Sequence, residues 1–294
     1  MKRVRRLGAV LLAGILLIVA AGGWVLSENA LRRLRPPFQV PLAEGEVAVE
    51  IAAHDGVTLR GALAPGAGPE TAVLLLHGVA DSRSGVAGQT ALLRKAGYTT
   101  LRADVRAHGA SGGDRLSFGV IEREDTKAWV RFLRGRGARR VYGFGVSMGA
   151  GILLQTPGEF TAIVADSPFA CFPGVAVWRV SQTTKWSPAA ASLFVNAALW
   201  IERLQSGRDL REACPEKALR ASATPVLLIH GGRDANIPPE HSQRLAAACG
   251  ANCTLVLVPE APHTMAIRVN EAWYRDKVLE FLGRGRGVAA PEAR

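Results

Sequence analysis

The sequence lacks the CxxC spacing that is typical of metal-binding cysteines. Its four cysteines, Cys171, Cys214, Cys249 and Cys253, contain no CxxC pair and have no histidine in register with them. A metal site is therefore not expected, and no residue is assigned as a metal ligand. An even number of cysteines suits disulfides in an oxidising compartment. Cys249 and Cys253 bracket a turn, so a local bridge between these two is geometrically possible.

Charged residues are also few, at 21% of the chain against 48% hydrophobic residues. This composition excludes a disordered protein, and 294 residues are enough for one globular domain with attachments. The formal net charge of +11 is a reason to consider nucleic acid as a partner. No nucleic-acid-binding motif accompanies the scattered arginines, so the basic faces are expected to be solvated and no nucleic-acid partner is predicted.

Within residues 1–26, the run 7–26 contains no charged side chain at all. At 1.5 Å rise per residue, about 20 helical residues reach the ~30 Å of a bilayer's hydrocarbon core. The run is longer than the ~7–15 apolar residues of a signal peptide, so we expect a transmembrane anchor that stays attached. The alternatives are a signal segment cleaved at the small residues from Val19 to Gly22, or a buried helix of a soluble protein.

The basic flanks of this segment indicate its orientation. Four basic residues precede it and three follow it closely, which favours an amino terminus in the cytoplasm and a folded domain outside the cytoplasm. Secretion after signal cleavage is the alternative. The same flanks suit an attraction to anionic lipid. They comprise Lys2, Arg3, Arg5, Arg6, Arg32, Arg33 and Arg35.

The folded domain is predicted over residues 45–283. Residues 27–44 are expected to form a stalk, because three prolines there break regular structure. Residues 284–294 are expected to form a disordered tail.

The domain begins with two alternating segments around Asp55 and Gly56, a dipeptide that favours a tight hairpin turn. Short apolar runs separated by helical stretches follow, which is typical of buried parallel strands in crossover units. The predicted fold class is α/β: a three-layer sandwich with a mostly parallel sheet, an antiparallel N-terminal hairpin and a helical cap insertion. The strands are predicted at 47–51, 57–63, 72–76, 99–104, 140–144, 161–165, 225–229 and 254–258. The helices are predicted at 87–96, 121–134, 150–155, 239–248 and 271–282.

The gap between the strands at 161–165 and 225–229 is too long for a plain crossover. Bulky apolar residues such as Trp178, Trp186 and Trp200 enrich it. We expect helices over about 169–222 to lie on the carboxyl edge of the sheet. They either cover the core or form a cap that shapes an apolar substrate pocket.

The sequence Gly145-Val146-Ser147-Met148-Gly149 spells GxSxG directly after a strand-like run. In a nucleophile elbow a strand turns sharply into a helix and exposes the serine hydroxyl above the sheet edge, and flanking glycines keep that turn free of side chains. Ser147 is therefore the candidate nucleophile.

A serine nucleophile needs a base, and the base needs an acid that orients it. The partners of an elbow serine follow in the order acid, then histidine, each after a strand. Asp234 follows the strand at 225–229, and His263 follows the last strand, so these two are the predicted partners. Asp166 is the rival acid. His54 and His241 are expected to be bystanders.

Acyl transfer also needs donors for an oxyanion. The predicted donors are the backbone N–H groups of Met148, directly after the nucleophile, and of Val79, in the loop after the strand at 72–76. Gly78 lets that loop approach the serine. His77 is expected to brace the loop by hydrogen bonds and not to act as a second base.

Taken together, these motifs resemble those of the α/β-hydrolase superfamily, over nearly all of residues 47–282. The branch that the chain resembles comprises membrane-anchored, esterase-like proteins allied to the mammalian abhydrolase-domain lipases and to serine aminopeptidase-like hydrolases. The resemblance implies a Ser-Asp-His hydrolase of carboxylic esters, thioesters or acylglycerols that uses no cofactor. It is carried by His77 and Gly78, by Asp104, Arg106, His108, Gly109, Ser111 and Gly112, by GVSMG, by Asp166 to Phe169, and by HGGRD.

The expected function is thus serine hydrolysis of a small-molecule or lipid ester, in the carboxylesterase or lipase class. A serine peptidase or amidase that uses the same residues is the alternative enzyme. A membrane-tethered binding protein with an idle site is the alternative of another class. The acyl length, the alcohol and the oligomeric state are not encoded in any motif of the sequence.

Overall fold

The computed structural model describes residues 2–32 and 40–284. An eight-stranded sheet runs through the domain in the order β1-β2-β4-β3-β5-β6-β7-β8. β2 pairs antiparallel with β1 and with β4, and the other neighbouring pairs are parallel. The strands are β1 (Val47–Ala52), β2 (Thr58–Ala64), β3 (Thr71–Leu76), β4 (Thr99–Ala103), β5 (Arg140–Val146), β6 (Ile163–Asp166), β7 (Val226–Gly231) and β8 (Cys253–Val258).

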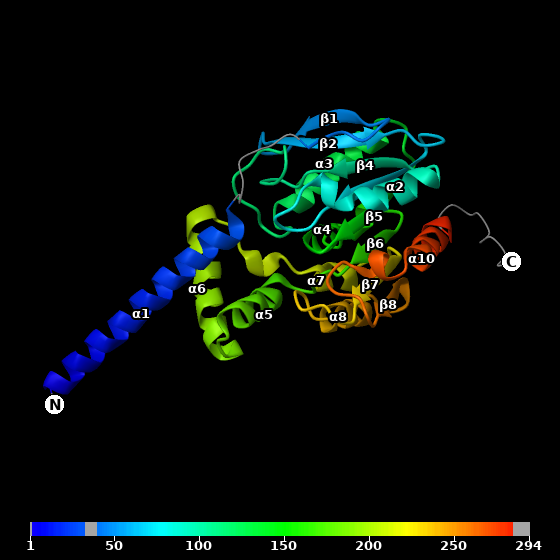
Figure 1. The fold of residues 1–294 in the computed structure, drawn as a ribbon. Helices are drawn as coiled ribbons and strands as arrows, with labels where there is room; N and C mark the ends of the chain where they lie inside the picture. The colour runs from blue at the N-terminus through cyan, green and yellow to red at the C-terminus, as the bar shows by residue number, and fades with distance from the viewer. Residues whose placement is uncertain (1, 33–39, 285–294) are drawn as a thin grey trace.

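Helices lie on both faces of this sheet (Figure 1). In β3 alternate side chains enter two separate cores: Leu74 lies in one core with Trp129, and Leu75 lies in the other core with Tyr274. The helices are α1 (Lys2–Leu31), α2 (Ala87–Lys95), α3 (Glu122–Arg134), α4 (Met148–Leu153), α5 (Phe172–Thr184), α6 (Pro188–Ser206), α7 (Pro215–Arg220), α8 (Glu240–Cys249), α9 (Ala266–Val269) and α10 (Glu271–Arg284).

The predicted three-layer α/β sandwich is confirmed. Each predicted strand and helix has a counterpart close to its predicted bounds. The parallel strands read as continuous apolar runs because both of their faces are buried, as they are along all of β7. β1 lies at the sheet edge and is largely exposed. At the hairpin turn Gly56 has a φ of 81°, a conformation that glycine adopts without steric cost.

α1 projects away from the domain and packs against α6 at its carboxyl end (Figure 1). By length and composition the stretch Val10–Leu31 is long and apolar enough to cross a membrane. The helix runs through Leu31, so residues 27–31 of the predicted stalk are helical. Residues 33–39 and the tail from 285 onward lie outside the described residues.

Between β6 and β7 lies the predicted insertion, which contains α5, α6 and α7. A disulfide joins Cys171, just before α5, to Cys214, just before α7, and so closes the insertion at its base. No motif in the sequence predicts that these two cysteines pair. A second disulfide joins Cys249 to Cys253, where a local bridge was geometrically possible.

Candidate active site

Ser147 lies in the turn that connects β5 to α4. Its backbone has φ 52° and ψ −117°, a combination that residues with side chains seldom adopt. Its N–H donates a hydrogen bond to the carbonyl of Asp166 in the neighbouring strand β6, at 2.8 Å. The strand-turn-helix geometry expected of a nucleophile elbow is therefore present at this serine.

The two glycines of GxSxG are required by close packing. A Cβ atom on Gly145 would lie 2.5 Å from the backbone N and Cα of Ala150, and one on Gly149 would lie 2.4 Å from the carbonyl oxygen of Leu76. Backbone atoms cannot move aside as a flexible side chain can. The turn thus admits no side chain at either position, which explains the spacing of the motif.

Asp234 lies in the loop between β7 and α8, and its carboxylate is held by the backbone. Oδ1 accepts hydrogen bonds from the N–H groups of Asn236, at 2.8 Å, and Ile237, at 2.9 Å. This arrangement leaves Oδ2 directed at the histidine of the following loop.

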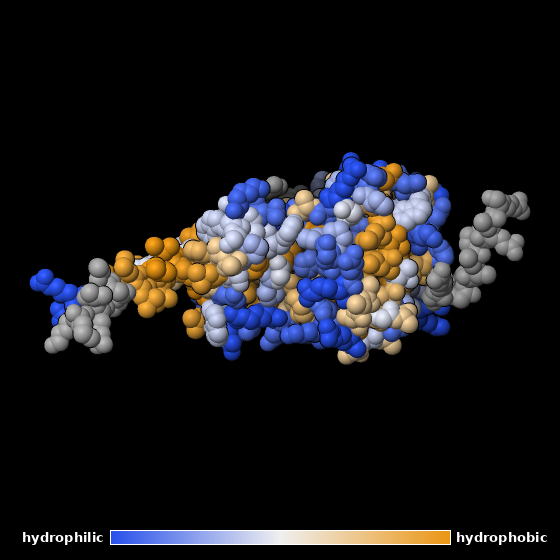
Figure 2. Space-filling view, turned by 90° about the horizontal axis from the view of Figure 1, so that it is seen from below, coloured by the Kyte–Doolittle hydropathy of each residue, from blue (hydrophilic) through white to orange (hydrophobic). Residues whose placement is uncertain are grey.

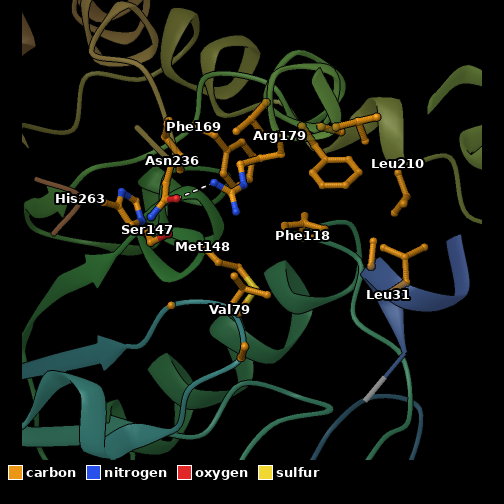
Figure 3. Close-up of a pocket in the computed structure, with 18 of the residues that line it drawn as sticks. Leu31, Val79, Phe118, Ser147, Met148, Phe169, Arg179, Leu210, Asn236 and His263 are labelled. Carbon is orange, nitrogen blue, oxygen red and sulfur yellow. Dashed lines mark hydrogen bonds between the residues drawn. The ribbon is translucent and has the colours of Figure 1, made fainter. Parts of the chain in front are cut away.

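His263 follows β8 and joins the other two residues. Its Nδ1 lies 2.6 Å from Oδ2 of Asp234, and its Nε2 lies 2.9 Å from Oγ of Ser147. A carboxylate can only accept, so the ring proton is assigned to Nδ1 and Nε2 accepts from the serine hydroxyl. The structure therefore brings Ser147, His263 and Asp234 together in one chain of hydrogen bonds; the first two are labelled in Figure 3.

Asp234 is strongly biased toward its ionised form. Burial by itself would raise the pKa of this carboxyl, but hydrogen bonds from His230 and His263 outweigh burial and hold the pKa well below its ordinary value. An ionised Asp234 can stabilise positive charge on the imidazole of His263.

His230 is a supporting residue that the sequence reasoning did not assign. Its ring is fully buried, and Nε2 lies 3.2 Å from Oδ2 of Asp234 and 2.8 Å from the carbonyl oxygen of Ile237. Its Nδ1 lies 2.6 Å from Oγ of Ser242. The available signal was its place at the end of β7, four residues before Asp234 within HGGRD.

Both predicted oxyanion donors, Met148 and Val79, belong to segments that lie next to Ser147. Met148 is the first residue of α4. Val79 follows Gly78, whose missing Cβ would lie 3.4 Å from Cβ of Ser147. Among the described residues, neither the N–H of Val79 nor that of Met148 donates a hydrogen bond to another protein atom. Both amides are therefore available to a ligand oxygen.

The rival acid, Asp166, makes its hydrogen bonds to other residues. The fully buried carboxylate of Asp166 accepts from the hydroxyls of Tyr274, at 2.9 Å, and Ser167, at 3.0 Å. Burial raises the pKa of Asp166, in contrast to Asp234. Its carboxylate makes no hydrogen bond to His263 within the described residues, so it does not replace Asp234 in the hydrogen-bonded chain.

Three further histidines lie outside the hydrogen-bonded chain of Ser147, His263 and Asp234. His77 braces its loop: Nδ1 donates to the carbonyl of Gly78 at 2.7 Å, and Nε2 accepts from the N–H of Val105 at 3.0 Å. His241 accepts from the N–H of Ala170 at 3.1 Å. His54 lies exposed in the turn after β1.

A cavity of about 550 Å³ opens beside Ser147 and His263. This volume lies within the ~300–1,000 Å³ typical of small-molecule sites. Arg179 and Asn236 lie toward its Ser147 end, whereas Phe118, Leu210 and Leu31 lie at the other end (Figure 3). Because α5 and α6 contribute much of the lining, the insertion shapes a pocket as well as covering the core. Across residues 2–32 and 40–284 no cluster of His, Cys, Asp or Glu could hold a metal ion.

Residues 73–276 match the model of the alpha/beta hydrolase family. The chain belongs to this family. The superfamily that the sequence motifs resemble is thereby confirmed. Among solved structures, the esterase Pf2001 of Pyrococcus furiosus superposes with a TM-score of 0.70 at 29% identity, over 86% of this chain and 98% of that one. An esterase from Exiguobacterium antarcticum shares the fold at 18% identity and a TM-score of 0.60, over 81% of this alpha/beta hydrolase and 100% of the esterase.

Two curated relatives extend the comparison. YqkD of Bacillus subtilis is 30% identical over 75% of this chain and 73% of its own length. Rv2307c of Mycobacterium tuberculosis is 29% identical over 96% of both chains. Both are described as uncharacterized proteins. Family membership and esterase neighbours support hydrolase activity for this alpha/beta hydrolase.

Replacement of Gly145 by alanine tests the packing of the serine turn. The new Cβ would meet the backbone of Ala150, so the turn must shift, and a displacement of reacting groups by about 1 Å can cost ~100-fold in rate. We expect a loss of that order in reaction with a fluorophosphonate probe. Gly158→Ala is the matched control, because nothing lies within 4 Å of its added Cβ. Equal labelling of both variants would contradict the expectation.

Proposed function

We propose that this alpha/beta hydrolase is a serine esterase that cleaves carboxylic esters or thioesters through an acyl-enzyme. The observation that carries the proposal is the hydrogen-bonded chain from Ser147 through His263 to Asp234, with both distances at 2.9 Å or less. The likeness to the esterase Pf2001, at 29% identity, supports an ester as the substrate. No cofactor is required by this chemistry.

In the proposed first step, Oγ of Ser147 attacks the carbonyl carbon of the ester. The hydroxyl proton passes to Nε2 of His263, and the imidazolium that forms is stabilised by ionised Asp234. The carbonyl oxygen gains the negative charge, which the amides of Val79 and Met148 would meet. The bond to the alcohol or thiol then breaks as His263 returns the proton to the leaving group.

In the second step, water attacks the acyl-enzyme. His263 takes a proton from the water, a second oxyanion forms and collapses, and the proton returns to Oγ of Ser147 as the acid departs. His230 would keep the carboxylate of Asp234 in place throughout, because its Nε2 lies 3.2 Å from Oδ2.

α1 supports a membrane-anchored form of this hydrolase. Its stretch Val10–Leu31 can span a bilayer by length and composition. The basic flanks favour an extracytoplasmic domain. The two disulfides suit the same oxidising location. Secretion after signal cleavage is the alternative. A full-length protein in the membrane fraction would favour the anchor, and a shortened protein outside it would favour cleavage.

Replacement of Ser147 by alanine removes the attacking oxygen. We expect the full-length variant to lose all labelling by a fluorophosphonate probe, measured by in-gel fluorescence, because only an activated serine is phosphonylated. The control is Ser84→Ala, which changes an exposed serine outside the hydrogen-bonded chain. Labelling of Ser147→Ala at the wild-type rate would mean that the nucleophile lies elsewhere. An unlabelled wild-type protein would favour an idle binding site.

Replacement of Asp234 or Asp166 by asparagine tests which of the two carboxylates assists His263. An amide cannot stabilise the imidazolium and selects the wrong ring tautomer, so kcat for a p-nitrophenyl ester is expected to fall ~10⁴-fold. Asp166→Asn should cost far less, because its carboxylate bonds to Tyr274 and Ser167 and not to His263. The assignment of the acid is reversed if Asp166→Asn gives the larger loss of kcat.

The serine peptidase or amidase alternative uses the same residues and is separated by its substrates. We expect turnover of p-nitrophenyl esters and no measurable turnover of matched aminoacyl anilides, because a site that stabilises the transition state of ester cleavage need not protonate the poorer amine leaving group. Anilides cleaved as fast as esters would favour the peptidase.

A further inference from the structure

The carboxyl end of α1 forms part of the wall of the active-site cavity. Five of its residues line the cavity: Leu26, Ser27, Asn29, Ala30 and Leu31. Figure 3 shows Leu31 at the end of the cavity opposite Ser147 and His263, next to Leu210 and Phe118. The helix that can span a membrane therefore also contacts the space that a substrate would occupy.

Two glycines hold this part of α1 tightly against the cap helix α6. A Cβ on Gly22 would lie 2.7 Å from the ring of Phe194, and a Cβ on Gly23 would lie 2.7 Å from Cβ of Ala197. The second Cβ would also lie 2.9 Å from the backbone N of Ala198. The two helices thus meet at backbone distance, as helices with small residues at their interface do in membranes.

Ion pairs tie the same turns of α1 to the cap and to the core. Arg115, in the loop before α3, contacts Glu28 of α1 and Glu202 of α6, each at 2.6 Å. Glu202 is buried, and the hydroxyl of Ser27 donates to it at 3.3 Å. A backbone hydrogen bond of 2.8 Å from the N–H of Leu116 to the carbonyl of Leu31 adds to this connection. The position of α1 on the cavity is therefore determined by several independent contacts.

The surface near this end of the cavity suits a lipid bilayer. Along α1, Val10 to Leu17 includes many exposed apolar side chains, and Figure 2 shows hydrophobic residues along this helix up to the domain. On α6, Leu193, Trp200 and Leu204 are more than half exposed, at 52%, 52% and 81%, and their spacing places them on one helix face. A bilayer entered by α1 would cover these side chains and lie beside the apolar end of the cavity.

We propose that Leu26, Ala30 and Leu31 form the acyl-chain wall of the site, and that the substrate is a single-chain amphiphilic ester drawn from the bilayer that α1 enters. The inference rests on the proposed esterase function and extends it to a substrate class. The ester bond lies at Ser147, the polar part of the substrate lies toward Arg179 and Asn236, and the chain extends toward α1. The anchor is then a determinant of chain-length selectivity as well as an attachment.

The test replaces a cavity-lining residue of α1 by a larger side chain in the full-length protein. Leu26→Trp adds bulk at a residue of the lining, whereas Val25→Trp places the same side chain at the neighbouring exposed residue, which does not line the cavity. The kcat/KM of each variant is measured on p-nitrophenyl acetate and p-nitrophenyl dodecanoate. One methylene in an apolar pocket is worth ~10–200-fold, so Leu26→Trp should lose at least about tenfold on dodecanoate and keep acetate within about twofold.

Val25→Trp should leave both esters unchanged. Equal changes on acetate and dodecanoate in Leu26→Trp, or none on either, would overturn the inference while the esterase function stands. Ala30→Trp provides a second variant with the same expectations, should Leu26→Trp not fold.

Binding without turnover distinguishes failure of this inference from failure of the proposed function. Free dodecanoate, the acid product of the long-chain ester, is titrated calorimetrically into three proteins. They are the single variant Ser147→Ala and the double variants in which Ser147→Ala is combined with Leu26→Trp or with Val25→Trp. We expect weaker binding, by about tenfold, only in the Leu26→Trp combination. If the wild type cleaves no ester but this difference is found, the esterase function fails and the acyl-chain wall stands. Equal binding by both combinations overturns the wall.

Discussion

Close packing between the end of β5, the start of α4 and the loop after β3 holds the backbone of Ser147 at a φ of 52°. A residue in such a conformation costs about 1–3 kcal/mol, so surrounding contacts must enforce it. The buried residues of α4 and the contact of Gly149 with the carbonyl of Leu76 supply that constraint. The same contact sets the distance between the serine and the loop that carries Val79. The elbow and the candidate oxyanion donors are therefore one packed unit.

The order of the sheet brings the other loops to this unit. β5, β6, β7 and β8 are adjacent and parallel, so their carboxyl ends lie at one edge. The loops after β5, β7 and β8 carry Ser147, Asp234 and His263 to that edge. β6 contributes through its backbone, since the carbonyl of Asp166 accepts from the N–H of Ser147. Three residues far apart in sequence meet because the strands that precede them end together.

Features that depend on local sequence could be predicted, whereas contacts between distant segments could not. Buried parallel strands appear as apolar runs in the sequence, and GxSxG predicts a strand-turn-helix. The fold class and the position of Ser147 could therefore be predicted from the sequence. The support of Asp234 by His230 was not, because nothing in HGGRD tells which polar groups a buried imidazole will face. Gly22 was also one of the small residues of a possible signal cleavage site, and only the contacts of Gly22 and Gly23 with α6 show their packing role.

The most consequential contact of this kind joins α1 to the cavity. The run 7–26 contains no charged residue and is expected to face lipid, whereas directly after it Ser27 is buried and Glu28 is paired with Arg115. Polar groups that are buried at the end of an apolar helix need hydrogen-bonding partners in the protein, and here those partners lie on the cap and the core. The apolar length of α1 and the polar contacts of its last turns therefore place the cap beside any membrane that the helix enters. In this geometry the depth of the helix in a bilayer also determines how far the apolar end of the cavity lies from the lipid chains.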